Sequence, residues 1–422
     1  MPIDILALIS QTLNALTATG FLPFILFVIA IIAGVKIGDA LRYGLMAGIG
    51  FFGMMSFMAI GAQHIAPYGT GISQKIGIPL EIPDVTVALP IAIAWGCLYA
   101  GLIMPLGVLF NFIFLALRLT KTIDVDLWNY FQYSLYAYVV YVITGNFLLG
   151  ILAWFVIQLI TFVIADKTAS FVQKEYGLPY MSMPHPHFSF NAIIAYPFKL
   201  LFDRIKLPEI DTATLRKKIG PFGDTVVIGF IIGLILGILA GFDWIAVIRE
   251  AVILSAICLI LPRMIGILVA GLTPIADALT KKLRQKFPGK EFYIGVDAAL
   301  GAAHPDCIIA SVVLIPIIVA TSFVLPGNMI LPMVSLGFVG WIVNAGAMFW
   351  RRNFIANLIY GWVVSVIWMY MATFSAPFLT MLAKNVGFAI PAGAKYVASF
   401  FGGGYYWDVV LLAILKALGL AS

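Results

Sequence analysis

The chain consists of long apolar runs separated by short clusters of charge. No Asp, Glu, Lys or Arg occurs in residues 5–35, 43–74, 85–117, 127–165, 307–350 or 353–383. A helix needs about 20 apolar residues to cross the hydrocarbon core of a membrane, so each run has room for at least one span. Strands of a membrane β-barrel alternate over about 10 residues, whereas these runs are apolar on all sides. The pattern therefore predicts an all-α polytopic membrane protein.

Composition agrees, because 62% of the 422 residues are hydrophobic and 10% are charged. An average globular chain is about 45–50% apolar and about 25% charged. Cys97, Cys258 and Cys307 lie far apart without a CxxC pair, so we expect neither a disulfide framework nor a zinc site. The N-terminus lacks the positive segment of a signal peptide, and the residues up to Gly20 are interpreted as an interfacial helix.

We predict eleven spans, in groups of five, five and one. They are 21–38, 41–61, 87–117, 128–145 and 146–165, then 225–241, 250–270, 307–325, 333–350 and 354–382, and finally 405–420. The corresponding domains are a first half (1–165), a cytoplasmic connector (166–223), a second half (225–382) and a final segment (383–422). Because five is odd, the second half enters the membrane from the opposite face, which predicts two inverted five-helix repeats, a common design in transporters.

Lys and Arg give the orientation, because cytoplasmic loops carry an excess of them. With the N-terminus outside, 20 of the 25 Lys and Arg residues fall on the inner side and four on the outer side. We therefore expect a periplasmic or extracellular N-terminus and a cytoplasmic C-terminus. This bias also accounts for the net charge of +6 without nucleic acid as a partner.

Each half contains a polar stretch broken by Gly and Pro, residues 61–90 in the first and 293–306 in the second. Paired interruptions at corresponding places indicate a transport site near the midplane of the membrane. We expect both stretches to be re-entrant.

Asp297 and His304 lie in the second stretch, which is too apolar for an ordinary loop. An ionisable group at membrane depth costs at least about 2.5–3.5 kcal/mol, so it tends to mark a substrate or ion path. The alternative is that Asp297 lies at the inner interface and balances the cations of residues 281–290.

His185 and His187 flank Pro186 between two predicted spans. Two histidines could hold a metal, but no third or fourth ligand lies nearby, so we predict no metal site. Either the segment dips into the protein and presents His185 to a polar ligand, or it is a plain cytoplasmic loop.

Neutral polar groups complete the candidate site. Asn129 and Gln132 are three residues apart and share one helix face, although they could instead join two helices. Each hydroxyl of a polyol both donates and accepts hydrogen bonds, which suits a site of amides, an imidazole and a carboxylate. The predicted substrate-binding residues are Asp84, Thr86, Asn129, Gln132, His185, Asp297 and His304.

Gly229, Gly233, Gly237 and Gly241 recur every four residues. This spacing predicts one smooth helix face for close packing. The sequence has no motif for ATP hydrolysis or covalent catalysis, and we expect no cofactor.

Several segments carry a resemblance to a known family. They are residues 84–85, 123–129, 219–224 with 228–233, 272–276, 292–299 with His304, and 325–328 with 331–332. In order and spacing they resemble the galactitol-type membrane component, called IIC, of the bacterial phosphoenolpyruvate-dependent phosphotransferase system, over nearly the whole chain.

The resemblance implies a homodimeric sugar-alcohol permease of the ascorbate–galactitol superfamily in the bacterial inner membrane, in contact with its lipid. A scaffold, here the hairpins 21–61 and 225–270, would support a mobile core, here 87–165 and 291–382, in an elevator-like motion. The resemblance also implies that Asp297 and His185 lie at the substrate. Separate IIA and IIB proteins would carry the phosphoryl group, so we expect no phosphorylation site in this chain. The basic stretches 199–218 and 281–290 either dock IIB or only anchor the inner face.

Two other functions stay open. One is an ion-coupled secondary transporter of a small polar solute, with Asp297 and His304 as a proton relay. The other is a membrane-embedded enzyme that uses His185, His187 and Asp297.

Overall fold

A computed structural model describes residues 23–76, 82–205, 207–208, 224–286, 291–332, 334–350, 352–391, 394–401 and 406–420. The expected interfacial helix before residue 21, and residues 209–223 of the expected connector, lie outside this part of the chain.

The described chain is mostly helical, with five very short strands. Up to residue 205 the elements are a helix Pro23–Ala33, α2 (Ile37–Ile76), β1 (Ile82–Pro83), α3 (Ala88–Gly96), η1 (Ala100–Leu102), α4 (Ile103–Ala116), β2 (Thr122–Asp124), η2 (Leu127–Tyr130), α5 (Phe131–Thr144), α6 (Phe147–Tyr176), β3 (Met181–Ser182) and α7 (Pro186–Ile205). From residue 225 they are α9 (Thr225–Ala240), α10 (Trp244–Lys286), β4 (Tyr293–Gly295), α11 (Ala299–Ala302), α12 (Pro305–Val324), β5 (Ile330–Leu331), η4 (Val334–Phe338), α13 (Val339–Ala347), α14 (Phe354–Asn385) and α15 (Trp407–Ala417).

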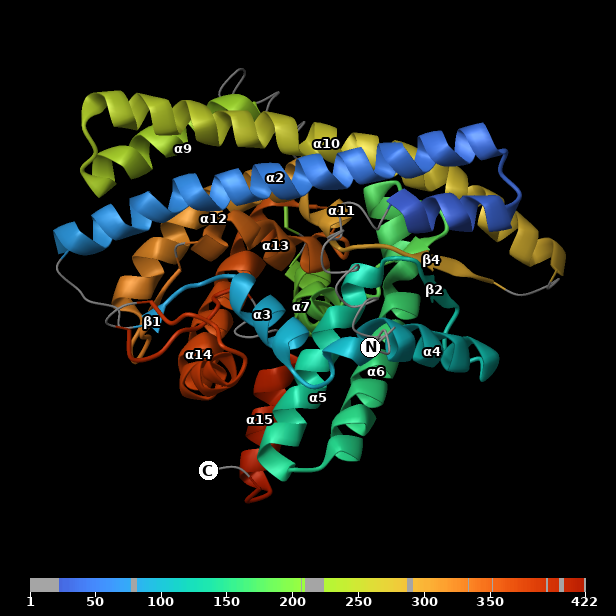
Figure 1. Ribbon diagram of the computed structural model, residues 1–422. Helices are drawn as coiled ribbons and strands as arrows, with labels where there is room; N and C mark the ends of the chain where they lie inside the picture. Colours follow the sequence, from blue (N-terminus) through green and yellow to red (C-terminus); the bar gives the residue numbers. More distant parts are fainter. Residues whose placement is uncertain are drawn as a thin grey trace, which may run out of the picture. The chain divides into compact units, whose positions relative to one another are not determined.

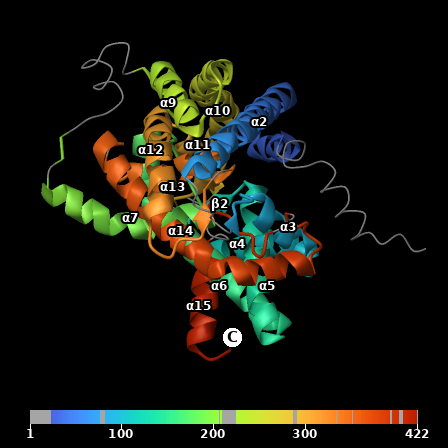
Figure 2. The same ribbon diagram turned by 90° about the vertical axis from the view of Figure 1, so that its left-hand side faces the viewer.

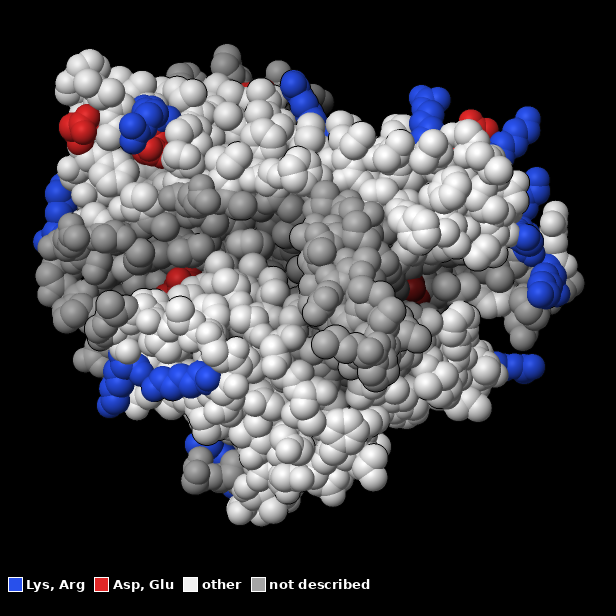
Figure 3. Space-filling view, in the orientation of Figure 1, with Lys and Arg blue, Asp and Glu red and all other residues white. Residues whose placement is uncertain are grey.

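Within the described residues, three helices, α6, α12 and α14, are long and apolar enough to cross a membrane, and α3 with α4 adds a fourth if the pair is one broken span. In Figure 3, most of the described surface on the face shown is uncharged. Large apolar side chains such as Leu148, Ile238 and Phe374 are exposed, as expected where helices face lipid. The prediction of a helical membrane protein is confirmed, whereas the count of eleven spans stays a prediction.

Two stretches of the first half differ from the sequence prediction. The run 87–117, expected as one span, is interrupted after α3. Tyr99 lies in this break, where its ring stacks on Phe147 with centroids 4.7 Å apart and its hydroxyl donates to the Phe147 carbonyl over 2.8 Å. Periodicity could not reveal this break, because the run is apolar throughout.

The other stretch is 61–90, expected to be broken, whereas α2 continues without interruption to Ile76 and carries Pro67 inside the helix. Tertiary packing stabilises this end of α2. Tyr68 stacks on Phe242, and a Cβ at Gly71 would lie 2.4 Å from the carbonyl oxygen of Ala240.

Contacts divide the chain into two compact units. Unit 1 comprises Met1–Met55, Cys97–Pro186 and Arg263–Leu300, and unit 2 comprises Ser56–Gly96, His187–Pro262 and Gly301–Ser422. Each unit therefore draws segments from both halves of the chain.

Each unit contains one small parallel sheet. In unit 1, β4 lies between β2 and β3, and Gly295 is paired with Asp124 and with Ser182. In unit 2, β1 pairs with β5, and Asp84 forms a bridge to Ala398. In both sheets, a strand from one half of the chain pairs with a strand of the other half and with a segment that follows that other half.

The α9–α10 hairpin confirms most of the predicted glycine face, and the two helices lie side by side in both ribbon views (Figures 1 and 2). A Cβ at Gly233 would lie 2.5 Å from the Cα of Ala251, and Gly229 and Gly237 also face α10 closely. Gly241 has another role, because it ends α9 with a positive φ of 80°.

The segment expected as a connector is largely structured where it is described. Helix α6 continues to Tyr176 and ends at Gly177, which has a φ of 65°. β3 and α7 then follow, and Met181, Ser182, His185 and His187 are all buried. Among these, His185 belongs to unit 1, as does α5, of which ten consecutive residues are buried.

Candidate functional site

The polar residues of unit 1 gather at the carboxyl ends of its three parallel strands. Asp126 follows β2, Asp297 follows β4 and His185 follows β3. The pairing of Gly295 with Asp124 and Ser182, continued by two residues, brings Asp297 level with Asp126 and Pro184. Pro184 packs on this sheet, since a Cβ at Gly295 would lie 2.7 Å from its ring. In open α/β sheets the carboxyl ends of parallel strands are the usual place of ligand sites.

Asp297 is 9% exposed. Its Oδ1 accepts a hydrogen bond of 2.8 Å from the Ala299 N–H. Burial raises the pKa of Asp297 to about 6, against the lowering effect of that hydrogen bond. Asp297 and Asp126 line a small, partly open pocket, whose other walls are Phe51, Val125, Leu268, Leu272, Val296 and Leu300.

Gln132 and His185 form a buried pair. The Gln132 amide nitrogen lies 2.9 Å from Nε2 of His185. Since an amide nitrogen only donates, Nε2 accepts and the ring is neutral. Burial agrees with this state, because it lowers the pKa of His185 to about 3. Oε1 of Gln132 is buried without a hydrogen-bond partner among the described residues.

Asn129 is also buried, and its amide nitrogen donates to both carboxylate oxygens of Asp124, over 3.1 and 3.3 Å. Burial raises the pKa of Asp124, and the neighbouring carboxylates of Asp126 and Asp297 raise it further. The Asn129 Oδ1 has no partner among the described residues. Asp124 and Asp126 were not among the predicted site residues, although two aspartates between apolar runs could have signalled them.

Asp84 and Thr86 belong to unit 2. Asp84 is 6% exposed. Its Oδ1 accepts from the Thr86 N–H, the Ser335 hydroxyl and the Phe400 N–H over 3.1, 2.7 and 3.0 Å. Its Oδ2 accepts from the Ser335 N–H over 2.8 Å. These bonds account for most of the acceptor capacity of a carboxylate.

His304 also belongs to unit 2, in a cluster with Asp306 and Arg352. Its Nε2 lies 2.7 Å from Nη1 of Arg352, and the same Nη1 lies 3.2 Å from the Asp306 carboxylate. A guanidinium only donates, so Nε2 of His304 accepts. Burial lowers the pKa of His304 to about 4, with opposing contributions from Asp306 and Arg352.

Asp84 and Asp297 occupy equivalent places in their sheets. Each lies at the end of a strand region that pairs with a strand of the other half and with the segment after that half, and each accepts from the N–H two residues later. Phe400 lies two residues after Ala398, the partner of Asp84. The corresponding position in unit 1, two residues after Pro184, is Pro186. Proline has no N–H to donate.

The second difference concerns the residue equivalent to Ser335. Counted from the paired strand positions, it is Asn129, whose amide nitrogen donates to Asp124. At Asp297, the donor equivalent to the Phe400 N–H is therefore missing, and the side chain equivalent to Ser335 donates to Asp124 instead. Asp297 therefore retains acceptor capacity for a ligand.

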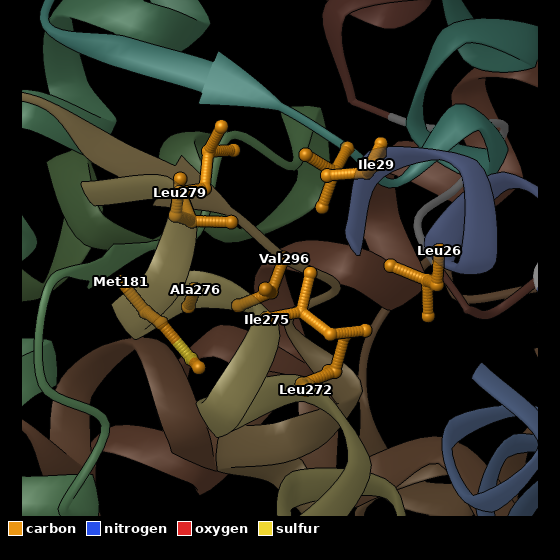
Figure 4. Close-up of a pocket in the computed structure, with 10 residues that line it drawn as sticks. Leu26, Ile29, Met181, Leu272, Ile275, Ala276, Leu279 and Val296 are labelled. Atoms are coloured by element: carbon orange, nitrogen blue, oxygen red, sulfur yellow. The ribbon is translucent and has the colours of Figure 1, made fainter. Parts of the chain in front are cut away.

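A second pocket of unit 1 carries no such chemistry. It is lined by aliphatic side chains and one methionine, which Figure 4 shows around Ala276 and Val296. Nor does any group of three or more His, Cys, Asp or Glu residues in the described chain have the geometry to hold a metal ion.

Comparison with known proteins identifies the family. The model of the PTS system sugar-specific permease component matches residues 13–393. The chain belongs to this family. It is therefore a membrane permease component of the phosphotransferase system (PTS), and the resemblance drawn from its motifs is confirmed.

Individual relatives agree. The galactitol-specific EIIC component of the PTS in Escherichia coli K12 is 31% identical over 393 residues, which are 92% of this chain and 86% of that protein. The protein of the same name in Escherichia coli O157:H7 gives the same values. Another K12 protein, provisionally named a permease IIC component, is 30% identical over 410 residues, or 96% of this chain and 94% of its own length.

Proposed function

We propose that this permease component carries a sugar alcohol similar to galactitol. It binds the substrate outside the cell, moves it inward by an elevator-like motion and releases it for phosphorylation by a separate IIB protein. IIB receives its phosphoryl group from IIA. The family match and the galactitol-specific relatives support this function. Two carboxylates, Asp126 and Asp297, line the same pocket, which favours a neutral substrate over an anionic one.

The observation that carries the proposal is the difference between the two equivalent aspartates. The Asp84 carboxylate is occupied by bonds within the protein, whereas Asp297 lines a pocket and accepts a hydrogen bond from the Ala299 N–H. In the proposed site Asp297 accepts two hydroxyls of the polyol. Asn129 and Gln132 accept further hydroxyls through their unpartnered amide oxygens, and His185 contributes its neutral imidazole.

The remaining predicted residues lie in unit 2. The Oγ1 of Thr86 is buried without a partner among the described residues, and we propose it as a further donor or acceptor for substrate. His304 would act at a later stage, on the inner side, where the sequence places its segment. The ion-coupled alternative assigns Asp297 and His304 a proton instead.

We further propose eleven spans arranged as two inverted repeats, with the N-terminus outside and the C-terminus inside. The order of elements supports the repeat. A two-helix hairpin, one strand, a broken helix, a second strand, two helices and a third extended segment follow each other in each half. We also propose a homodimer built on the scaffold hairpins, with basic residues of the inner face as the docking surface for IIB.

Uptake in membrane vesicles tests this function. Vesicles that contain the protein should accumulate galactitol phosphate only with phosphoenolpyruvate, the general PTS proteins, IIA and IIB present. Uptake of free galactitol that follows an ion gradient, without phosphoenolpyruvate, would instead establish the secondary transporter. Vesicles with Asp297→Asn serve as the matched control and should lose most of the uptake.

A further inference from the structure

Asp84 connects three segments that are far apart in the sequence. Besides its own turn, it binds Ser335 at the start of η4 and Phe400 in the extended segment 394–401. The backbone closes the same junction, because Val85 donates to the Ala398 carbonyl over 2.9 Å and Ala398 donates to the Pro83 carbonyl over 3.2 Å. All these residues belong to unit 2, so the junction is part of one compact body.

Thr86 lies at the end of this junction in a strained conformation. Its φ is 49°, a region that β-branched residues enter only when surrounding structure imposes it. The N–H of Thr86 donates to Asp84 over 3.1 Å. This bond fixes the turn directly before α3 and thereby the direction in which the Thr86 side chain leaves the backbone. The Thr86 hydroxyl is buried and has no partner among the described residues.

From this geometry we infer that Asp84 is a positioning residue for transport. It holds Thr86 in the strained turn so that the Thr86 hydroxyl meets the substrate, and it does not bind substrate itself. Its carboxylate would have to give up a bond within the protein to accept one from a ligand. The inference rests on the proposed function, since it takes the Thr86 hydroxyl as a contact of the polyol.

A comparison of Asp84 with the equivalent Asp297 shows why the two carboxylates differ in role. The residue two beyond Asp297 is Ala299, which has no hydroxyl, and Asp297 faces a pocket. The first half therefore uses its aspartate to position a neighbouring hydroxyl, and the second half uses the aspartate as the ligand. An inverted repeat that kept the same turn in both halves has in this way acquired two chemical roles.

A double-mutant cycle tests the inference with galactitol as the probe, by calorimetric titration of purified protein. Thr86→Val removes the hydroxyl and keeps the shape, and should weaken binding about five- to tenfold. Asp84→Asn keeps one acceptor and replaces the other by a donor that faces the Ser335 N–H, so the turn loosens and binding weakens about tenfold. In the Thr86→Val background, Asp84→Asn should change the dissociation constant less than twofold.

Thr380→Val is the matched structural control. The Thr380 hydroxyl accepts from the Val397 N–H over 2.9 Å, so it supports the same extended segment without contact to Thr86. It should lower the melting temperature and leave the dissociation constant unchanged. If Asp84→Asn behaves like this control, or if the cycle is additive, Asp84 is only a structural residue and the inference fails.

The proposed function is judged separately. Should Thr86→Val bind galactitol as tightly as the wild type, the inference is wrong, while a loss of binding in Asp297→Asn would still support the polyol site. If Asp84→Asn does not fold, Ser335→Ala replaces it. This variant removes the hydroxyl bond that helps to hold Oδ1 of Asp84, while the Thr86 N–H can still donate to the same oxygen. The inference then requires a smaller loss of affinity in Ser335→Ala, and that loss should also disappear in the Thr86→Val background.

Discussion

At the scale of single residues, Asp297 is the most sensitive position of the proposed site. Asp297→Asn keeps the shape of the side chain but removes the charge and turns one acceptor into a donor. Loss of a charge-assisted hydrogen bond in a buried site costs about 1.5–3 kcal/mol, or roughly ten- to a hundredfold in affinity. Calorimetric titration with a panel of hexitols and pentitols measures this effect.

The control for that prediction is Asp277→Asn, which removes an exposed carboxylate of α10 in the same unit and should leave affinity unchanged. His185→Ala should also weaken binding, and its effect should not add to that of Asp297→Asn if both side chains contact one ligand. Wild-type affinity in Asp297→Asn would remove this residue from the site and leave the interfacial-charge interpretation.

The same carboxylate predicts a pH dependence of binding. Because burial raises the pKa of Asp297 to about 6, the group is ionised at pH 7.5 and mostly protonated at pH 5. The charged form is the better acceptor for hydroxyls, so galactitol affinity should fall as pH decreases through about 6. Asp297→Asn should lose this dependence, and titrations between pH 5 and 8 decide the matter. A persistent dependence in the variant would assign it to another buried carboxylate of the site, such as Asp124.

At the scale of helices and strands, the glycine face of α9 should govern stability. A Cβ at Gly233 would lie 2.5 Å from the Cα of Ala251, so Gly233→Leu must force the hairpin apart. Overpacking of this kind costs typically about 1–3 kcal/mol. Thermal unfolding in detergent should show the loss, whereas galactitol affinity of the folded fraction should change little.

Gly266→Leu on α10 is the matched control, because nothing lies within 4 Å of a Cβ placed there. It should unfold near the wild-type temperature. Equal destabilisation by both substitutions would mean that helix propensity, not packing against Ala251, determines the effect. A clean loss of binding in well-folded Gly233→Leu would instead place α9 in the site.

The sequence predicted these elements unevenly, for physical reasons. Long apolar runs predicted α6, α12 and α14 well, since burial and lipid both favour apolar helices there. The Gly and Pro residues of 61–90 suggested an interruption that, up to Ile76, the packing of Tyr68 and Gly71 overrides. Strands of two or three residues carry no local pattern, because they exist only through pairing with distant segments. For the same reason the sequence could place Asp84 and Asp297 in similar segments but could not reveal that Asp84 is occupied.

At the scale of the whole molecule, orientation in the membrane follows from charge. Each Lys or Arg on a short loop favours the cytoplasmic side, and the proposed topology places 20 of 25 there. The opposite orientation would translocate all of these cations and retain four. The described native cysteines, Cys97, Cys258 and Cys307, are buried, so introduced surface cysteines can be labelled selectively.

A membrane-impermeant maleimide applied to intact cells therefore tests the topology. Lys384→Cys, at an exposed position expected outside, should be labelled, and Lys281→Cys, at an exposed position expected inside, should be labelled only after the cells are opened. A reporter fused after Ser422 gives an independent measurement, because it should be active only in the cytoplasm. Periplasmic activity of that reporter, with Lys384→Cys still labelled from outside, would remove the last span and leave ten. The two halves would then be complete repeats without an additional helix, and the C-terminus could not contribute to a cytoplasmic docking surface for IIB.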